Sequence, residues 1–205
     1  MKRLFITSLL FLSVGLSQKL YEVIETYENG NIESITYHKK IRDSIVKVKV
    51  EGYHYTGQKK SEGTYKNKEL DGLYTEWYRN GQKYSEKTFK DGNLDGLYTE
   101  WYDNGQKYSE VTYKDGNLHG LYTEWYENGQ KKSETTYNYG GEDGLHTGWY
   151  ENGQKKEEIN YTDGEKMGLG TGWYSNGQKK FERTYVDGGF LPEKEWTEDG
   201  LLIRY

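Results

Sequence analysis

The chain repeats one block of 24 residues, and this period constrains the fold more than any other feature. Five tryptophans stand 24 positions apart, at Trp77, Trp101, Trp125, Trp149 and Trp173. An Asn-Gly pair follows three positions after each tryptophan, ending in Gly81, Gly105, Gly129, Gly153 and Gly177. Tyr53 occupies the tryptophan position one period upstream, and Trp196 follows 23 positions after Trp173. Such a fixed period is typical of repeat architectures in which each unit packs only on its neighbours.

Each block predicts a β-hairpin. Residues 121–126 are rich in aromatic and β-branched side chains, which favour a strand, and residues 131–137 supply a second strand. The Asn-Gly pair between them predicts a two-residue type I′ turn, in which both residues have positive φ. The second connection, residues 90–96, contains two glycines and predicts a longer loop. Gly and Asn in every half period disfavour a helix.

A turn centred on Asn80-Gly81 predicts a register in which Tyr78 faces Lys83, Trp77 faces Tyr84, Thr75 faces Glu86, and Leu73 faces Thr88. Opposed residues share one face of the pleat. One face would therefore carry Leu73, Thr75, Trp77 and Tyr84, and the other Tyr74, Glu76, Tyr78 and Phe89. The tryptophans and turn glycines are predicted to be structural. The candidate binding surface is the repeated tyrosines, Tyr74, Tyr78, Tyr98, Tyr102, Tyr122, Tyr126, Tyr150 and Tyr174.

Composition decides between disorder and a thin sheet. Only 33% of the residues are hydrophobic, which is low for a globule, but 16% are aromatic. Ordered rings bury roughly 150 to 250 Å² each, so several per repeat can stabilise a sheet without a broad core. The predicted fold class is therefore all-β: an elongated, antiparallel β-hairpin repeat array, single-layer or thin and curved, with a period of 24 residues.

Segments that depart from the repeat predict the domain organisation. Residues 18–52 form an N-terminal cap with a degenerate repeat around Asn29-Gly30 and an alternating, half-buried strand at 44–50. Residues 53–189 are the repeat array. Residues 190–205 form a C-terminal cap, in which Pro192 breaks the pattern and residues 201–203 are aliphatic.

Residues 1–17 predict a signal peptide. Lys2 and Arg3 precede an apolar run from Leu4 to Leu16, and the small residues before Gln18 suit signal peptidase cleavage. The run is short for a membrane span, so we expect an exported protein, in the periplasm, on the cell surface or secreted, with no transmembrane span after signal removal. An uncleaved membrane anchor is the alternative. With no cysteine, the chain has neither a lipid attachment site nor a disulfide.

Charge disfavours nucleic acid as a partner. Without Lys2 and Arg3, 26 basic residues remain against 33 acidic ones, a net charge of −7, whereas nucleic-acid binding requires a basic stripe. Lysine pairs recur after each turn, for example Lys131-Lys132, and Glu134 follows two positions later. Interleaved charges on a solvated surface are the favoured interpretation; an anion-binding stripe is the alternative.

Neither catalytic nor metal-binding residues stand out from the repeat. The four histidines, His38, His54, His119 and His146, occupy unrelated positions, and the repeated carboxylates lack the distinct environments that acid–base catalysis requires. Residues 91–96 fit the start of a calcium-binding EF-hand loop, but Tyr102 stands at the twelfth position, where that loop needs glutamate. We therefore predict that the protein is not an enzyme and has no cofactor or metal.

The repeated letters carry a family resemblance. Residues 113–120, Y-K-D-G-N-L-H-G, followed by a strand and Asn128-Gly129, resemble the MORN repeat, and W-Y-x-N-G-Q-K-K-S-E resembles its bacterial variant across about residues 53–200. The resemblance implies stacked antiparallel hairpins. The chain departs from the pattern in mid-strand, where Val111 or Thr135 replaces a glycine. Many bacterial members are labelled antitoxin components, and eukaryotic relatives scaffold proteins.

Three functions remain open at the level of sequence. The favoured one is an exported, non-enzymatic scaffold that binds an unidentified protein through its repeated Tyr and Trp surface, because such residues dominate interface hot spots. The second is a cell-wall or glycan-binding module, in which the rings would stack on sugars. The third is an antitoxin-like component, which would require the chain to stay inside the cell.

Overall fold

The computed structural model describes residues 4–10 and 19–204, and it divides the chain into two compact units, residues 1–96 and 97–205. All regular elements in the described residues are β-strands, and every pairing is antiparallel. The predicted fold class, a β-hairpin repeat array with a 24-residue period, is thereby confirmed. The division between the units falls within β8 (Asn93–Trp101). None of the described residues forms a helix long and apolar enough to cross a membrane.

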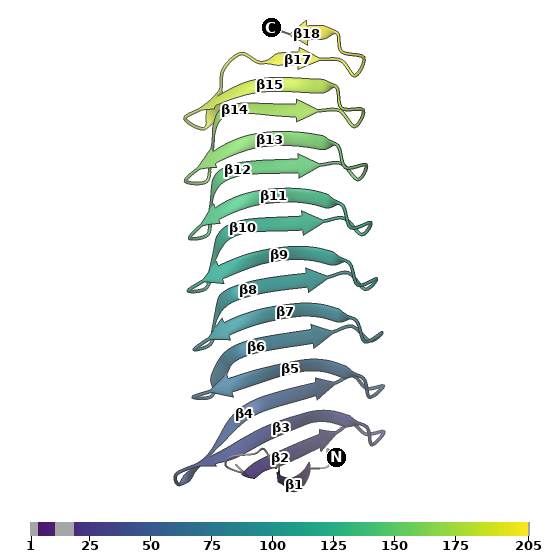
Figure 1. Cartoon of the computed structure of the whole chain (residues 1–205), viewed down its shortest axis with the longest axis vertical. Coiled ribbons are helices and arrows are strands. Elements are labelled where there is room, and N and C mark those ends of the chain that lie inside the picture. Colours follow the sequence, from purple (N-terminus) through teal and green to yellow (C-terminus); the bar gives the residue numbers. More distant parts are fainter. Residues whose placement is uncertain (1–3, 11–18, 205) are drawn as a thin grey trace. The chain divides into compact units, whose positions relative to one another are not determined.

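The N-terminal unit pairs its strands in chain order, each with the next (Figure 1). Its strands are β1 (Leu4–Leu10), β2 (Lys19–Thr26), β3 (Ile32–Ile41), β4 (Ser44–Tyr53), β5 (Lys59–Lys66), β6 (Glu69–Trp77) and β7 (Lys83–Lys90). Within the segment predicted as a signal peptide, β1 pairs with β2 from Leu4 opposite Glu25 to Leu10 opposite Lys19. The expected cleavage site before Gln18 lies outside the described residues, so export stays a prediction.

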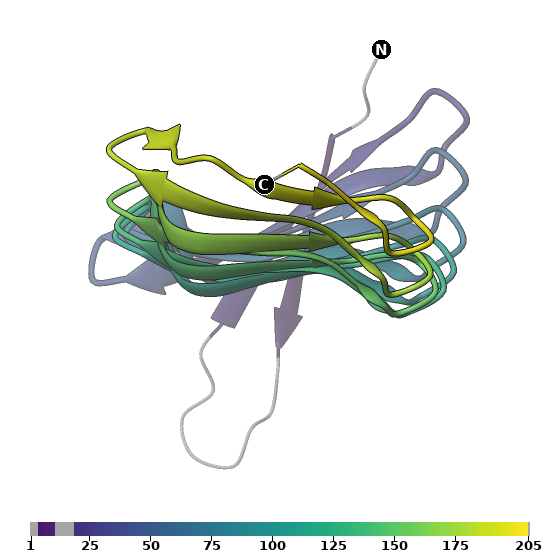
Figure 2. The ribbon, with the colours of Figure 1, turned by 90° about the horizontal axis from the view of Figure 1, so that it is seen from above.

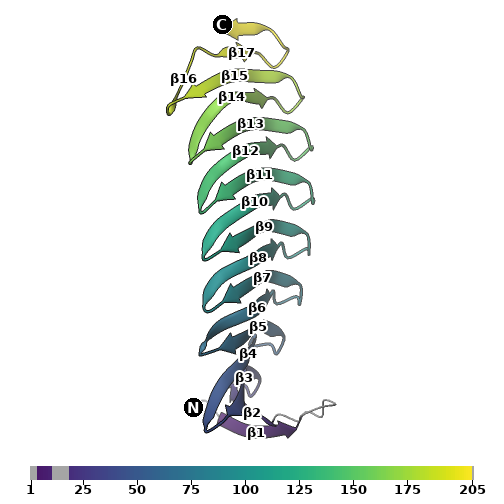
Figure 3. The ribbon, with the colours of Figure 1, turned by 60° about the vertical axis from the view of Figure 1, so that its left-hand side comes forward.

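The C-terminal unit continues the same order from β9 to β15, and β15 then pairs with both β16 and β17 (Figure 3). Its strands are β9 (Lys107–Lys114), β10 (Asn117–Trp125), β11 (Lys131–Asn138), β12 (Gly141–Trp149), β13 (Lys155–Thr162), β14 (Glu165–Trp173), β15 (Lys179–Val186), β16 (Gly189–Phe190), β17 (Lys194–Trp196) and β18 (Leu202–Arg204). Seen from above, strands β9 to β15 form one layer (Figure 2). A single layer leaves little interior, and the buried hydrophobic residues in the described part of this unit are Val111, Ile159 and Tyr185.

The Asn-Gly turns are not type I′, which corrects the prediction from sequence. Gly129 has φ +82°, but Asn128 is not among the residues with positive φ. Gly129 N donates to Tyr126 O at 2.9 Å, and Tyr126 N donates to Gln130 O at 2.8 Å. This is a three-residue loop, a type I turn followed by a left-handed glycine that forms a bulge. The Asn128 side chain stabilises it, because Oδ1 accepts a hydrogen bond from Gln130 N at 2.9 Å.

The type I′ turn lies instead at the other end of the hairpin. Asp115 and Gly116 have φ +49° and +81°, and the strands on either side pair up to Lys114 opposite Asn117. The predicted loop at residues 90–96 is likewise wrong, because β8 already begins at Asn93. The second glycine of this segment lies in a bulge within the strand. In the next repeat, where Gly120 is the equivalent of Gly96, three residues of β10 lie opposite one residue of β9.

The register inside the hairpin follows the prediction except beside the turn. Leu73 faces Thr88 and Thr75 faces Glu86, as predicted, but Trp77 faces Lys83 and not Tyr84. The bulge beside the turn causes this shift, and the Tyr84 ring packs edge-to-face on Tyr78 with centroids 5.1 Å apart. We call the face that carries Leu121, Thr123 and Trp125 in each repeat the tryptophan face, and the opposite one the tyrosine face.

The N-terminal segment predicted as a cap contains the turn of the repeat, and the C-terminal one forms an ion pair with β15. The β2–β3 hairpin has the repeat turn: Gly30 N donates to Tyr27 O at 3.0 Å, and Tyr27 N donates to Asn31 O at 2.8 Å. At the other end, buried Glu193 pairs with Arg183 of β15 and with Arg204 of β18. The capping function of these segments stays a prediction.

Candidate functional site

On the tryptophan face, five tryptophans are each covered by a lysine of the preceding repeat: Trp77, Trp125, Trp149, Trp173 and Trp196. Lys107 Nζ lies 5.4 Å from the Trp125 ring centroid, and the same contact recurs between Lys131 and Trp149 at 5.8 Å. The lysine also pairs with the glutamate three residues later, as in Lys107–Glu110 at 2.5 Å. The positive charge of each such lysine is thus balanced within the sheet, by the tryptophan ring and by the glutamate. This arrangement favours interleaved charges on a solvated surface over an anion-binding stripe.

A row of exposed leucines runs beside those tryptophans. In the C-terminal unit it consists of Leu97, Leu121, Leu145 and Leu169, whose side chains are between 45% and 57% exposed. They share the tryptophan face because they precede the tryptophan by an even number of strand residues. Contiguous exposed apolar side chains mark interaction surfaces. The sequence placed Leu73 on the face of Trp77, but the leucines were not predicted as a binding surface, although leucine recurs with the same period and parity as tryptophan.

On the tyrosine face, the phenols bind carboxylates of their own strand. Tyr98 donates to Glu100 at 2.6 Å, and Tyr122 donates to Glu124 at 3.2 Å. Ser133 on the facing strand also donates to Glu124, at 2.8 Å. Burial, reinforced by Glu124, raises the pKa of the Tyr122 phenol. The rings pack against the next aromatic row, as in Tyr122–Tyr137 with centroids 6.0 Å apart.

A second tyrosine row joins one repeat to the next. Tyr126 donates its hydroxyl to the main-chain oxygen of Trp149 at 2.8 Å, and Tyr102, Tyr150 and Tyr174 make the equivalent bonds at 2.8 to 2.9 Å. Asn128 does the same at the turn, donating to Glu151 O at 3.1 Å. The eight tyrosines predicted to bind a partner are half-buried in the sheet. Their binding role stays a prediction, and the structure adds a cohesive one.

Three of the turn glycines, Gly129, Gly153 and Gly177, lie against glutamines of the preceding repeat. Gly81, Gly105, Gly129, Gly153 and Gly177 all have positive φ, between 81° and 85°. A Cβ on Gly129 would stand 2.7 Å from Gln106 Oε1, and one on Gly153 would stand 2.6 Å from Gln130 Oε1. The Asn-Gly-Gln sequence therefore forms the turn and also makes the contact between one turn and the next. Sequence reasoning used only the turn.

One position of the tyrosine face gathers potentially reactive groups. His146 replaces the tyrosine of the earlier repeats; its Nδ1 lies 2.7 Å from Thr135 Oγ1, and its Nε2 lies 3.9 Å from Glu157 Oε1. The His146 imidazole beside it lowers the pKa of the Glu157 carboxyl, although burial raises it. Thr135 is only 4% exposed. A substrate therefore cannot reach its hydroxyl, and the cluster is suited to cross-strand cohesion.

The most strongly perturbed carboxyl lies in the N-terminal unit. Glu51 is buried and accepts hydrogen bonds from Tyr53 at 2.7 Å, Tyr37 at 3.1 Å and Lys59 at 3.2 Å. Lys49 Nζ lies 2.8 Å from the same carboxylate. Burial raises its pKa, but these donors outweigh that effect and lower it to about 2. Glu51 thus stays ionised inside a saturated polar cluster. Burial in turn raises the pKa of Tyr37 to about 12.

The described residues hold no group of three His, Cys, Asp or Glu side chains able to bind a metal ion. The EF-hand-like residues 91–96 instead form the type I′ turn at Asp91-Gly92 and the start of β8.

Comparison with known proteins identifies a family. The family model described as MORN repeat variant matches residues 48–67, 70–91, 94–115, 118–139, 142–163 and 168–187, which is more than half of the chain. No curated protein matches. Among solved structures, a porin-like protein from Bacteroides uniformis shares 13% identity over 91% of each chain, with a TM-score of 0.22. That score is too low to support any argument about fold or function.

Proposed function

Because the chain belongs to the MORN repeat variant family, we propose that it is a non-enzymatic binding scaffold that captures a protein partner on its tryptophan face. The observation that carries the proposal is the leucine row, which places one half-exposed leucine in each repeat on the same face as a tryptophan. A partner that covers the row would remove this apolar surface from water. Export through residues 1–17 belongs to the proposal as well.

The geometry supports a protein partner better than a glycan. Sugar recognition of the predicted kind requires aromatic faces open to a sugar ring. Lysines lie over the tryptophan rings, as Lys155 does over Trp173 at 5.9 Å, and the turn tyrosines bind the next repeat. The cellular compartment distinguishes the scaffold from an antitoxin-like component, which would stay inside the cell. Mass spectrometry of the mature protein tests this, because an exported chain would start at Gln18.

Partner capture tests the leucine row directly. We expect that replacing Leu97, Leu121, Leu145 and Leu169 by serine abolishes capture of the partner that cross-linking and mass spectrometry identify with the wild-type protein. The circular dichroism spectrum should stay that of a β-sheet, because the row is exposed. Serine at Leu191, Leu201 and Leu202, which are exposed outside the row, is the matched control and should leave capture intact. Undiminished capture by the row variant would refute the proposed interface.

A further inference from the structure

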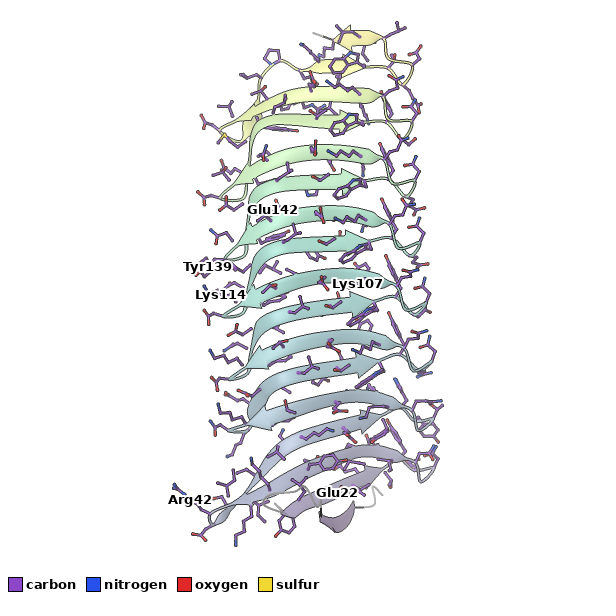
Figure 4. All side chains as sticks on the ribbon, in the orientation of Figure 1. Glu22, Arg42, Lys107, Lys114, Tyr139 and Glu142 are labelled. Carbon is purple, nitrogen blue, oxygen red and sulfur yellow. The ribbon has the colours of Figure 1, made fainter. Side chains whose placement is uncertain are left out.

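A hollow opens in the N-terminal unit between the tip of the β3–β4 hairpin and the β5–β6 turn. Its cavity volume is about 300 Å³, and its lining comes from β3, β4, β5 and that turn. Figure 4 shows Arg42 at the tip of the β3–β4 hairpin. The volume lies at the lower end of the roughly 300 to 1,000 Å³ of small-ligand pockets, so the hollow suits one large side chain.

Its lining combines apolar side chains with four lysines. Its apolar part is formed by Ile41, which is 47% exposed, together with Val46, Val48 and Tyr65. The lysines are Lys39, Lys47, Lys66 and Lys68, and none of the lining residues is acidic. Lys47 Nζ lies 3.5 Å from the Tyr65 ring centroid, which places an ammonium group next to the apolar surface.

No carboxylate within the described residues neutralises these lysines: all the ion pairs of the N-terminal unit involve other lysines. The acidic residues that follow the β5–β6 turn point toward the next turn. Glu69 Cδ lies 3.5 Å from the position that a Cβ on Gly92 would take, and Asp71 Oδ2 lies 3.4 Å from Asp91 N. The hollow therefore presents uncompensated positive charge around an apolar surface.

Lys68 also breaks the repeat at this place. The equivalent positions of the later repeats are all glycines with positive φ, at Gly92, Gly116, Gly140, Gly164 and Gly188. Lys68 adopts φ +75°, a conformation that a residue with a long side chain rarely takes. Backbone strain of this kind is concentrated at functional sites. Here the strained residue adds a charge to the hollow.

We propose that this hollow is the docking site for a short acidic peptide segment that carries one large apolar side chain. The side chain would enter between Ile41 and Tyr65, and flanking carboxylates would pair with the lysines, which reproduces the apolar core and polar rim of protein interfaces. The proposal rests on the scaffold function and adds the chemistry of a partner.

Selection from a random twelve-residue peptide library, displayed on phage and panned against the whole protein, tests this chemistry without assuming a sequence. We expect the enriched peptides to be acidic and to share one Leu, Ile, Phe or Trp. Their affinity, measured by fluorescence anisotropy, should fall at least tenfold when that residue becomes Ser. It should fall as much in the Lys66→Gln/Lys68→Gly variant, and it should weaken as salt is raised.

The variants separate binding from folding. Lys68→Gly restores the glycine of the other repeats, so the sheet should keep its thermal midpoint or gain stability. Lys90→Gln is the matched control, one repeat after Lys66, and should bind like the wild type.

Three outcomes would overturn the proposal: no peptide is enriched, the enriched peptides are not acidic, or they bind the double variant as tightly as the wild type. A fourth is that vesicles with an acidic phospholipid bind in a lysine-dependent way while acidic peptides do not. If one of these outcomes is found and capture through the leucine row still persists in the double variant, only the docking assignment falls and the scaffold function stands.

Discussion

At the scale of residues, tyrosine stabilises this sheet in two ways. The ring supplies half-buried apolar area, and the hydroxyl satisfies a polar group that a single layer could not otherwise shield. Tyr126 bonds to the main chain of the next repeat, and Tyr122 bonds to a carboxylate on its own strand. Aromatic content can therefore replace an aliphatic core.

Removing one such hydroxyl should be measurable. We expect Tyr126→Phe to lower the free energy of unfolding by about 1 kcal/mol, because it leaves the Trp149 carbonyl without its donor. Urea unfolding followed by circular dichroism measures the change. Tyr139→Phe is the control, since Tyr139 is 59% exposed; an equal loss in both variants would contradict a specific role for the Tyr126 bond.

The lowered pKa of Glu51 predicts that the free energy of unfolding decreases in acid. Its pKa is about 2 in the folded protein and 4.5 ordinarily, so the folded state binds fewer protons. The stabilisation is fully present above pH 4.5 and is lost as pH falls toward 2. We expect Glu51→Gln to cost on the order of 1 to 3 kcal/mol at pH 7 and much less near pH 2. Urea midpoints at both values test this, with exposed Glu28→Gln as control; an equal cost at both would contradict it.

At the scale of elements, opposed residues on neighbouring strands change together from repeat to repeat. Glu124 faces Ser133 across the hairpin, whereas Gly148 faces Glu157 and Gly172 faces Phe181. At Gly172 a Cβ would stand 2.2 Å from Phe181 Cε1. The ring thus occupies the space that the glutamate of earlier repeats fills, so the pair is one packing unit.

This pairing predicts non-additive substitutions. Gly172→Glu alone should destabilise the protein by about 1 to 3 kcal/mol because the new side chain collides with the Phe181 ring. Adding Phe181→Ser recreates the Glu–Ser pair of the earlier repeats and should recover most of that loss. A double-mutant cycle in urea measures the coupling. Gly141→Ala, where the nearest atom to a Cβ is 3.7 Å away, is the control; purely additive effects would refute the pairing.

At the scale of the whole molecule, stability is spread along the chain. Among the residues whose burial is described, 20–204, the buried hydrophobic ones are few, and most buried side chains are threonines and serines of the strands, such as Thr99, Thr123, Thr135 and Ser109. Each repeat is fixed mainly by contacts with the repeats before and after it. A repeat should therefore be removable, provided that the alternation of faces is kept.

Deletion of residues 118–141, one full period of 24, should leave a folded protein with a β-sheet spectrum and a lower thermal midpoint. Deletion of residues 118–140 should instead disrupt the sheet, because a shift of one residue turns every following side chain to the opposite face. Circular dichroism and analytical ultracentrifugation compare the two. Equal behaviour of the two deletions would show that the register of the repeat is not what holds the array.

The sequence by itself determined the period, the antiparallel hairpins and the turn glycines, because strand alternation and left-handed glycine are local properties of the backbone. It also separated Trp77 from Tyr74 onto opposite faces. The turn types and the place of Tyr84 were decided by the tertiary structure, since the bulge that shifts Trp77 opposite Lys83 forms only when the hairpin closes.

The contacts between repeats were likewise beyond the sequence. The bond from Tyr126 to Trp149 joins residues 23 positions apart, and the contact of Lys107 with Trp125 joins residues 18 positions apart. Both depend on how one hairpin stacks on the next. The lysine-lined hollow depends further on the length of the β3–β4 hairpin, which brings Lys39 and Ile41 beside the β5–β6 turn. Local chemistry fixes each hairpin, and stacking alone decides which side chains meet and which stay open to a partner.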